Sequence, residues 1–268
     1  MPMFLIIVSC LISAGMSLSS CTTAKLQPNS PPAERSQPEP GTPSNDIDAL
    51  IRAIKDNDVE TVKRLLTAGI NPNEKGSDKY APLMMAVLKR NRLTVELILN
   101  AGAKVDAPDD IGVTPLMKAV EFGDAEVVNL LIQKGADVTV KDRYGSTVLH
   151  HAARYADTNM MKLLLSKARN VDPTDSEGNT PLMLTPDNTD IGVFNLLIER
   201  GADANAKNKY GGTPLLAAIR STKMVEILIA HGADVNAKDM DGWSPLESAM
   251  LHGCRATVRL LENAHAKE

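Results

Sequence analysis

The sequence is poor in the residues from which catalytic and metal sites are usually built. Its 268 residues include three cysteines, five histidines and one tryptophan, and aromatic residues make up only 3%. The single histidine pair, His150-His151, consists of adjacent residues, which point to different faces of a helix and cannot easily bind one metal ion together. No Gly-x-Ser-x-Gly, His-Glu-x-x-His or phosphate-loop motif occurs. We therefore expect no enzyme, no cofactor, no small-molecule substrate and no metal site.

The sequence also lacks a basic excess and a long apolar segment. The formal net charge is −4, the isoelectric point is near 5.8, and the basic residues are scattered. Nucleic acid is therefore not an expected ligand. The apolar run within residues 3–18 is shorter and more interrupted than the roughly 20 residues of a transmembrane helix.

This apolar start has the character of a secretory signal. It ends in Leu18-Ser19-Ser20-Cys21, which resembles the box of bacterial lipoproteins, where the chain is cleaved before Cys and that Cys is lipidated. The resemblance implies a signal peptide at 1–20, lipidation at Cys21 and attachment to the membrane of the bacterial envelope. Thr22 rather than Asp follows, which in that family favours the outer membrane. No Lys or Arg precedes the apolar run, so an ordinary signal, cleaved or uncleaved, is the alternative.

Residues 21–45 are rich in proline, serine, glutamine and asparagine, a composition that cannot build a core. We expect a flexible tether that could reach on the order of 75 Å. It would hold the rest of the chain away from a membrane, facing the periplasm.

From residue 46 onward one phrase recurs every 33 residues. Its copies are Ala81-Pro82-Leu83, Thr114-Pro115-Leu116, Thr147-Val148-Leu149, Thr180-Pro181-Leu182 and Thr213-Pro214-Leu215, with Ser244-Pro245-Leu246 after 31 residues. A second phrase follows, as in Gly135-Ala136-Asp137 and Gly201-Ala202-Asp203. Thr or Ser can cap a helix, Pro suits its first position, and Gly suits the left-handed residue at a helix end.

The two phrases and their spacing resemble the ankyrin repeat. The resemblance implies an all-α fold, a solenoid of helix-turn-helix units with β-turn fingers, and the absence of enzymatic activity. We expect seven units in 46–268, at about 48–80, 81–113, 114–146, 147–179, 180–212, 213–243 and 244–268.

Two units depart from the pattern. In the fifth, Pro186 and Gly192 fall inside the expected helices, which predicts a distorted unit. In the fourth, Val148 replaces the proline, and Ala168-Arg169 replace Gly-Ala, so a residue with a Cβ must occupy or avoid the left-handed turn. The stack is expected to bend there.

Two residues with reactive side chains have structural explanations. His150 matches the His of the family's Thr-Pro-Leu-His phrase, which implies a hydrogen bond within the turn network. Cys254, the one thiol left if Cys10 and Cys21 are removed or modified, is interpreted as a small apolar residue of a repeat helix.

The aromatic residues point to a binding surface. Phe194 occupies a core position, whereas the remaining aromatics outside the signal fall on turn tips or first-helix ends, the positions that contact partners in the ankyrin family. Tyr, Trp and Arg are also enriched at interface hot spots. The predicted partner-binding residues are Tyr80, Ile111, Phe122, Arg143, Tyr144, Arg154, Tyr155, Lys209, Tyr210, Arg220, Met240 and Trp243.

The sequence therefore predicts a non-enzymatic module that binds another protein through a concave face while a lipid holds it in the bacterial envelope. One specific form is an immunity or inhibitor protein against a secreted antibacterial toxin. The alternatives are an envelope adaptor that supports a periplasmic enzyme in stress defence, and an unprocessed ankyrin effector that acts on host proteins.

Overall fold

The computed structural model describes residues 43–185 and 191–266, with side chains from residue 47 onward. The predicted signal peptide, Cys21, nearly all of the predicted tether and Pro186 lie outside these residues. Within them every regular element is a helix, which confirms the all-α prediction.

The described helices form seven pairs. In chain order they are α1 (Pro43–Lys55) with α2 (Val59–Thr67), α3 (Pro82–Leu88) with α4 (Arg92–Asn100), α5 (Pro115–Glu121) with α6 (Ala125–Gln133), α7 (Val148–Tyr155) with α8 (Thr158–Leu165), the 3-10 helix η1 (Pro181–Leu184) with α9 (Ile191–Glu199), α10 (Pro214–Ala217) with α11 (Thr222–Ala230), and α12 (Pro245–Leu251) with α13 (Arg255–Asn263). Helix α1 begins before residue 46, where the repeats were expected to start.

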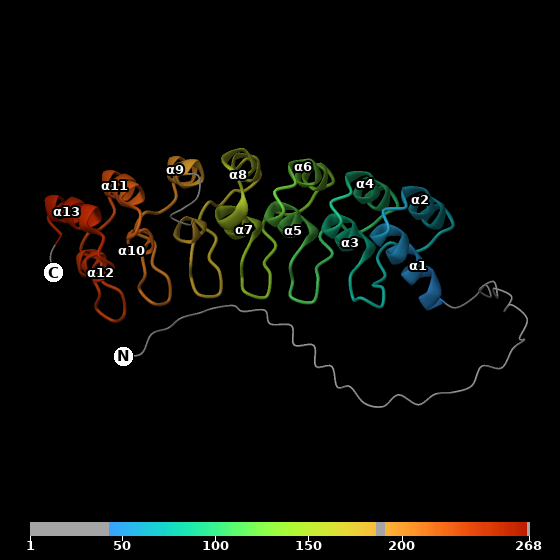
Figure 1. Ribbon diagram of the computed structural model, residues 1–268, viewed down its shortest axis with the longest axis horizontal. Coiled ribbons are helices and arrows are strands. Elements are labelled where there is room, and N and C mark those ends of the chain that lie inside the picture. Colours follow the sequence, from blue (N-terminus) through green and yellow to red (C-terminus); the bar gives the residue numbers. More distant parts are fainter. Residues whose placement is uncertain (1–42, 186–190, 267–268) are drawn as a thin grey trace, which may run out of the picture. The chain divides into compact units, whose positions relative to one another are not determined.

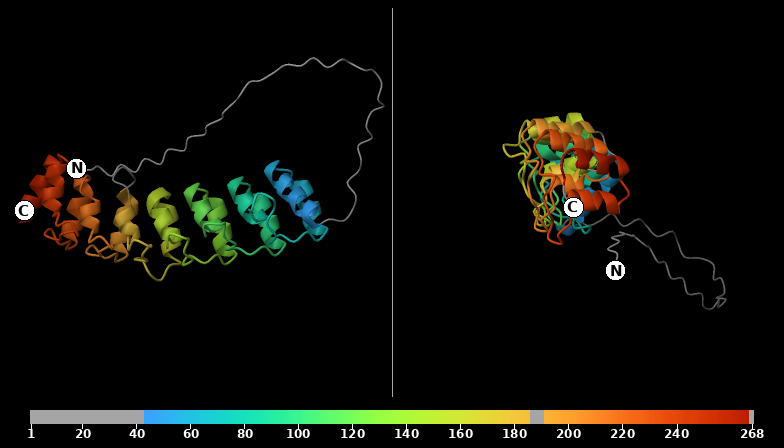
Figure 2. Two further views of the ribbon diagram at one scale, coloured as in Figure 1. Left: turned by 90° about the horizontal axis from the view of Figure 1, so that it is seen from below. Right: turned by 90° about the vertical axis from the view of Figure 1, so that its left-hand side faces the viewer.

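The pairs of the repeat unit are stacked side by side in a row. The first helices form an inner layer, the second helices form an outer layer, and long loops project beyond the inner layer like fingers (Figure 1). Figure 2, which shows the row from below and along its length, displays the same regular stacking. The row curves gently, with the fingers on the inner side of the curve.

Side-chain caps begin most of the described helices, as expected, although Ala81 before α3, Thr180 before η1 and Cys254 before α13 supply none. The Thr114 hydroxyl accepts a hydrogen bond from Met117 N at 3.3 Å, and the Ser244 hydroxyl accepts one from Glu247 N at 3.2 Å. The second helices use other caps, whose oxygens accept from the backbone three residues ahead; these residues are Asp58, Asn91, Asp124, Asp157 and Ser221. Capping satisfies N–H groups that a helix leaves free at its first turn.

A single apolar core runs through the row between the two helix layers. It extends from Leu50 in α1 to Leu261 in α13 and includes Phe194, which is 1% exposed, as predicted. One helix pair has too little area to bury its own apolar face, so each unit depends on its neighbours. At the ends of the row fewer neighbours are present, and Met250 and Leu251 of α12 remain exposed.

The fifth unit is distorted, as predicted. Its first helix is reduced to the four-residue 3-10 helix η1, and the Thr180 hydroxyl that should cap it has no hydrogen-bond partner. Gly192, however, lies in the first turn of α9 and not in the interior of a helix. The predicted break inside the second helix is therefore not seen, because Gly192 lies at the start of α9.

The structure of the fourth unit shows how the chain accommodates Val148 and Ala168. Helix α7 begins at Val148 without a proline, because a proline at the first helical position is favourable but not required. Ala168 is absent from the residues with positive φ, so the chain avoids the left-handed turn there. The consequences for the outer layer are described below.

Candidate functional site

Each finger tip is shaped by one short polar side chain. The Asp142 carboxylate accepts hydrogen bonds from Tyr144 N at 2.9 Å and Ser146 N at 2.8 Å. Equivalent pairs of bonds are made by Asp109, Asp175, Asn208 and Asp239. An Asp or Asn that binds the backbone two residues ahead stabilises a tight turn. At each of these five tips the same turn therefore presents the residue that stands two positions after the Asp or Asn.

The fingers from 109–113 to 239–243 are joined by a ladder of backbone hydrogen bonds. The bonds run from Arg143 N to Ile111 O (2.9 Å), Ser176 N to Tyr144 O (2.7 Å), Lys209 N to Glu177 O (2.8 Å) and Met240 N to Tyr210 O (2.9 Å). Gly145 permits this approach, because its φ is +72° and a Cβ would lie only 2.7 Å from Ser176 N. The tips are therefore held as one surface.

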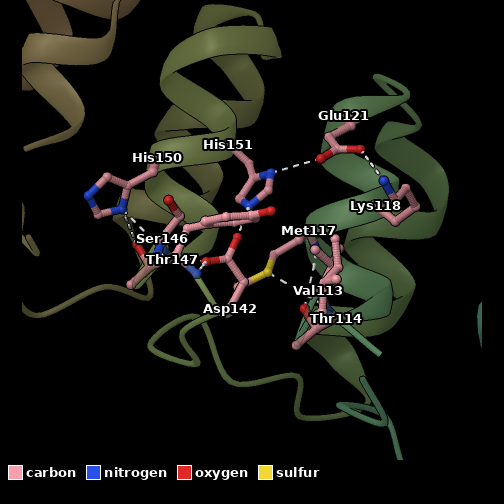
Figure 3. A network of polar contacts seen from close by, with 12 residues as sticks. Val113, Thr114, Met117, Lys118, Glu121, Asp142, Ser146, Thr147, His150 and His151 are labelled. Carbon is pink, nitrogen blue, oxygen red and sulfur yellow. Dashed lines mark hydrogen bonds and ion pairs between the residues drawn. The ribbon is translucent and has the colours of Figure 1, made fainter. Parts of the chain in front are cut away.

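A polar network connects the inner helices α5 and α7 with the finger between them (Figure 3). His151 lies between two carboxylates, with Nδ1 2.9 Å from Glu121 Oε1 and Nε2 3.3 Å from Asp142 Oδ2. Lys118 Nζ donates to Glu121 Oε2 at 2.6 Å. Burial of Glu121 opposes ionisation, but the hydrogen bonds from His151 and Lys118 outweigh it and lower the Glu121 pKa. The network fixes the floor beneath the finger tips.

His150 is fully buried on the opposite side of α7 and has the structural role that was predicted (Figure 3). Its Nδ1 accepts from Thr147 N at 3.0 Å, and its Nε2 lies 3.1 Å from Asn179 O in the next finger. Burial lowers the His150 pKa. A neutral ring that accepts at Nδ1 and donates at Nε2 satisfies both contacts.

A hollow of about 460 Å³ opens above this floor. The fingers contribute Ile111, Tyr144 and Glu177, and the inner helices contribute Lys118, Glu121, His151, Arg154 and Tyr155. Tyr144 and Tyr155 are 60% and 57% exposed, although tyrosine is a residue that proteins usually bury in large part. The hollow is therefore an uncovered surface with two aromatic side chains on its walls.

The structure brings some predicted partner-binding residues together and separates others. Ile111, Tyr144, Arg154 and Tyr155 line the hollow. Phe122, Arg143, Lys209, Tyr210, Arg220, Met240 and Trp243 are exposed at the predicted tips and helix ends but do not line it. Tyr80 is only half-exposed and packs against the core; it directly precedes the helix-start phrase, in the position of the buried Val113. Contact of the twelve predicted residues with a partner stays a prediction.

Sequence reasoning missed several residues of the hollow. Lys118 and His151 lie three residues after Pro115 and Val148, on the face of the first helix that looks toward the fingers. Glu177 occupies the same tip position as Ile111 and Tyr144. Leu251 of α12 does not line the hollow, but it is 68% exposed and occupies the helix-end position of Glu121 and Arg154. The register of the repeat indicates all four positions, whereas the prediction relied on aromatic residues and arginine.

The hollow is suited to gripping side chains. Two tyrosines offer apolar area with a polar edge, and neither Arg154 nor Glu177 forms an ion pair with another described residue. Among the described residues no group of three or more His, Cys, Asp and Glu is placed to hold a metal ion. Cys254 is half-buried against the core.

None of the described helices combines the length and the apolar character that crossing a membrane requires. This finding concerns residues 43–185 and 191–266. The apolar run near the start of the chain lies outside them.

Comparison with known proteins identifies the repeat. A family profile described as ankyrin repeats (3 copies) matches residues 50–142, 116–208 and 185–267. The crystal structure of the ankyrin repeat domain of Bcl-3, a member of the IkappaB protein family, is similar at 26% identity with a TM-score of 0.68, covering 80% of this chain and 97% of that domain. Comparison with curated proteins finds no match. Since the profile covers nearly the whole described chain, the protein belongs to the ankyrin-repeat family.

Proposed function

We propose that the chain is a non-enzymatic module that captures another protein on the inner side of its curve, in the hollow flanked by Tyr144 and Tyr155. The observation that carries this proposal is the exposure of both tyrosines beside the unpaired Arg154, on a floor fixed by the Glu121–His151–Asp142 contacts. Rigid aromatic anchors on a pre-formed surface contribute most to binding energy because little entropy is lost when they are covered.

Capture of a partner tests this proposal. The purified chain is used as bait in an extract of the source cells, and bound proteins are identified by mass spectrometry. In the triple variant Tyr144→Ala, Tyr155→Ala and Tyr210→Ala, the affinity for the partner should fall by roughly 100-fold or more, since truncating one hot-spot residue costs about 2 kcal/mol of binding free energy. Leu93→Ala is a matched control, because Leu93 is 59% exposed but lies on the outer helix α4.

The circular dichroism spectrum should be unchanged in both variants, because the three tyrosines are exposed and contribute little to the core. The proposal fails if the triple variant retains its partner as tightly as the wild type. It also fails if Leu93→Ala loses the partner to the same degree.

We further propose that the module is attached by lipid at Cys21 to the bacterial outer membrane and faces the periplasm. Support comes from the apolar run that ends in Leu18-Ser19-Ser20-Cys21 and from the proline-rich segment that follows. Cys21→Ser should move the protein from the membrane fraction to the soluble fraction, and globomycin should make the unprocessed wild-type form accumulate. An unchanged distribution would contradict the attachment.

An immunity or inhibitor role against a secreted toxin is the more specific form of this proposal. A rigid, tethered binder can cover an active site without any chemistry of its own. Deletion of the gene should then sensitise cells to a toxin produced by neighbouring cells, and the triple tyrosine variant should not restore resistance. If deletion causes no sensitivity but a periplasmic enzyme is captured, the adaptor role is supported instead.

A further inference from the structure

The outer loops close with one recurring hydrogen bond, except after α8. After α6, Gly135 has a φ of +89° and Ala136 N donates to Leu131 O at 3.0 Å. The same bond closes the loops that follow α2, α4, α9, α11 and α13; its donors are Ile70, Ala103, Ala202, Ala233 and Ala266. After α8, Lys167 N and Ala168 N instead both donate to Leu164 O at 3.0 Å. In each regular loop the residue at the position of Ala168 has positive φ, and it is glycine in five loops and His265 in the last. Ala168 does not adopt positive φ, which is costly for alanine, so this loop takes a different path.

A second bond is missing at the same place. Successive outer loops are joined where a side-chain oxygen accepts from the backbone of the next loop, as Asn205 Oδ1 accepts from Asp234 N at 2.7 Å. Asn73, Asp106 and Asp172 make the equivalent bond. The corresponding residue after α6 is Thr139, whose hydroxyl donates to Asp137 of its own loop at 2.7 Å. The described loops that follow α6 and α8 are therefore not joined in this way.

A hollow of about 620 Å³ lies at this junction, between the loop ends of α6 and α8. At every other junction, from α2 against α4 to α11 against α13, neighbouring outer helices are in more extensive contact than α6 and α8. Val138 and Leu149 form an apolar floor, and Ile132, Ala168 and Pro173 form half-buried walls. Arg169 occupies the position of Ala136 and Ala202, and because burying a guanidinium is costly, its loop does not fill the space.

The rim of the hollow carries more positive than negative groups. Lys141, Lys167 and Arg169 line it, and none of the three forms an ion pair with a described residue; Lys141 Nζ donates to Thr174 O at 2.7 Å. The lining also contains two carboxylates, Asp137 at the rim and the more deeply placed Asp172, whose Oδ1 is buried and has no hydrogen-bond partner among the described residues. Burial raises the Asp172 pKa, while hydrogen bonds from Thr139 lower the Asp137 pKa. Lys167 and Arg169 are exposed and free to meet an anion.

We propose that this hollow binds an amphiphile with an unbranched hydrocarbon chain and a carboxylate head, of the fatty-acid class. The hydrocarbon chain lies between the half-buried Ile132, Ala168 and Pro173, above the buried Val138 and Leu149, and its own apolar surface is removed from water. The carboxylate meets Lys167 and Arg169 at the rim, where charge-assisted hydrogen bonds form. A volume of about 620 Å³ lies within the range of small-molecule sites. The site lies on the outer-loop side of the row and does not depend on the proposed partner surface.

Three probes with the same ten-carbon chain test both parts of the proposal. Decanoate and decyltrimethylammonium below their micelle concentrations, and decan-1-ol below its solubility limit, are titrated into the full-length chain, and binding is followed by calorimetry and by methyl NMR. Decanoate should shift the methyl signals of Ile132, Val138 and Leu149. Decan-1-ol should bind roughly tenfold more weakly, because it cannot form the charge-assisted bonds.

One variant removes the hollow together with the charge of Arg169, and a second variant reverses that charge alone. The double variant Ala168→Gly with Arg169→Ala restores the ordinary loop sequence, so it should close the hollow and abolish decanoate binding. Arg169→Glu keeps a charged residue that stays exposed, so the hollow should remain open. It should weaken decanoate binding by about tenfold or more and strengthen decyltrimethylammonium binding.

Circular dichroism should show that both variants are folded. The proposal is overturned if decan-1-ol binds as tightly as decanoate, or if the double variant binds decanoate unchanged. Methyl shifts confined to residues away from the hollow, or no detectable binding of decanoate to the wild type, would overturn it as well.

Discussion

The finger edge and the outer-loop edge of the repeat row are joined in different ways. Along the fingers, backbone bonds continue without interruption from Ile111 to Met240. Along the outer loops, the bonds depend on the side chain at one position, and at Thr139 the bond to the next loop is lost. The fourth unit is regular on one edge and irregular on the other.

This difference shows which substitutions a repeat tolerates. Four finger glycines meet two demands at once, a positive φ and a close neighbouring backbone, so no other residue fits well there; they are Gly112, Gly145, Gly178 and Gly211. The outer-loop glycines have positive φ, but a Cβ at Gly135 or Gly201 would meet nothing within 4 Å. Replacement there changes the path of one loop and leaves the stack intact.

Replacing a finger glycine should cause the largest effect. Gly145→Ala should lower the free energy of unfolding by roughly 3 kcal/mol, because strain at positive φ adds to a clash with Ser176 N. Gly242→Ala is the matched control; its φ is +84°, but no atom lies within 4 Å of the new Cβ, so about 1 kcal/mol is expected. Urea unfolding followed by circular dichroism measures both, and equal losses would contradict the role of the close approach.

Removing an outer-loop bond should cost less. Asn205→Ala deletes the bonds to Asp234 N and Gly232 O, of 2.7 and 2.9 Å, and should lower the free energy of unfolding by about 1–2 kcal/mol. Thr139 occupies the equivalent position but makes no bond to the next loop, so Thr139→Ala should lower the free energy of unfolding by less than about 0.5 kcal/mol. The comparison of the two edges would be wrong if Thr139→Ala were the more damaging change in the same urea titration.

Rebuilding the outer loop of the fourth unit should stabilise the protein slightly. Ala168→Gly with Arg169→Ala restores a residue that accepts positive φ and a small side chain that can be buried, with an expected gain of about 1 kcal/mol. Arg169→Ala alone should give less, because Ala168 still opposes the turn. Thermal unfolding measures the gain, and a lower melting temperature in the double variant would show that the loop path has another cause.

The smallest effect concerns pH and the contact that His150 makes with the next finger. Because the folded-state pKa of His150 is lowered, the unfolded chain takes up a proton first as the pH falls below about 6.5. Stability is therefore complete above that pH and should fall by up to about 1 kcal/mol at pH 5.5. In His150→Gln this part of the slope should vanish, as measured by urea titrations at several pH values. An unchanged slope would assign the dependence to other groups.

Most of the fold was predictable because the repeat is a local pattern. The Thr-Pro-Leu phrase indicated the helix starts at Pro115, Pro214 and Pro245, and the apolar spacing indicated the buried residues. The shortness of α10 was not predictable, since its sequence, Pro214 to Ala217 and beyond, has no helix breaker. Packing against the shortened η1 is a property of the stack and not of the segment.

The candidate site was predictable only in part. Tyr144 and Tyr155 were identified because aromatic residues are rare in this chain and occupy exposed positions of the repeat. The contacts of His151 with Glu121 and Asp142 join residues 30 and 9 positions away, so no local pattern contains them.

The sequence by itself determined the repeat, its register and the exposed positions along it, because each of these follows from capping, periodicity and glycine within one unit. It also marked the fourth unit as irregular through Ala168 and Arg169. Only the tertiary structure decided what that irregularity does. The hollows on the two sides of the row lie between units, and their size depends on how neighbouring loops pack, which no single repeat specifies.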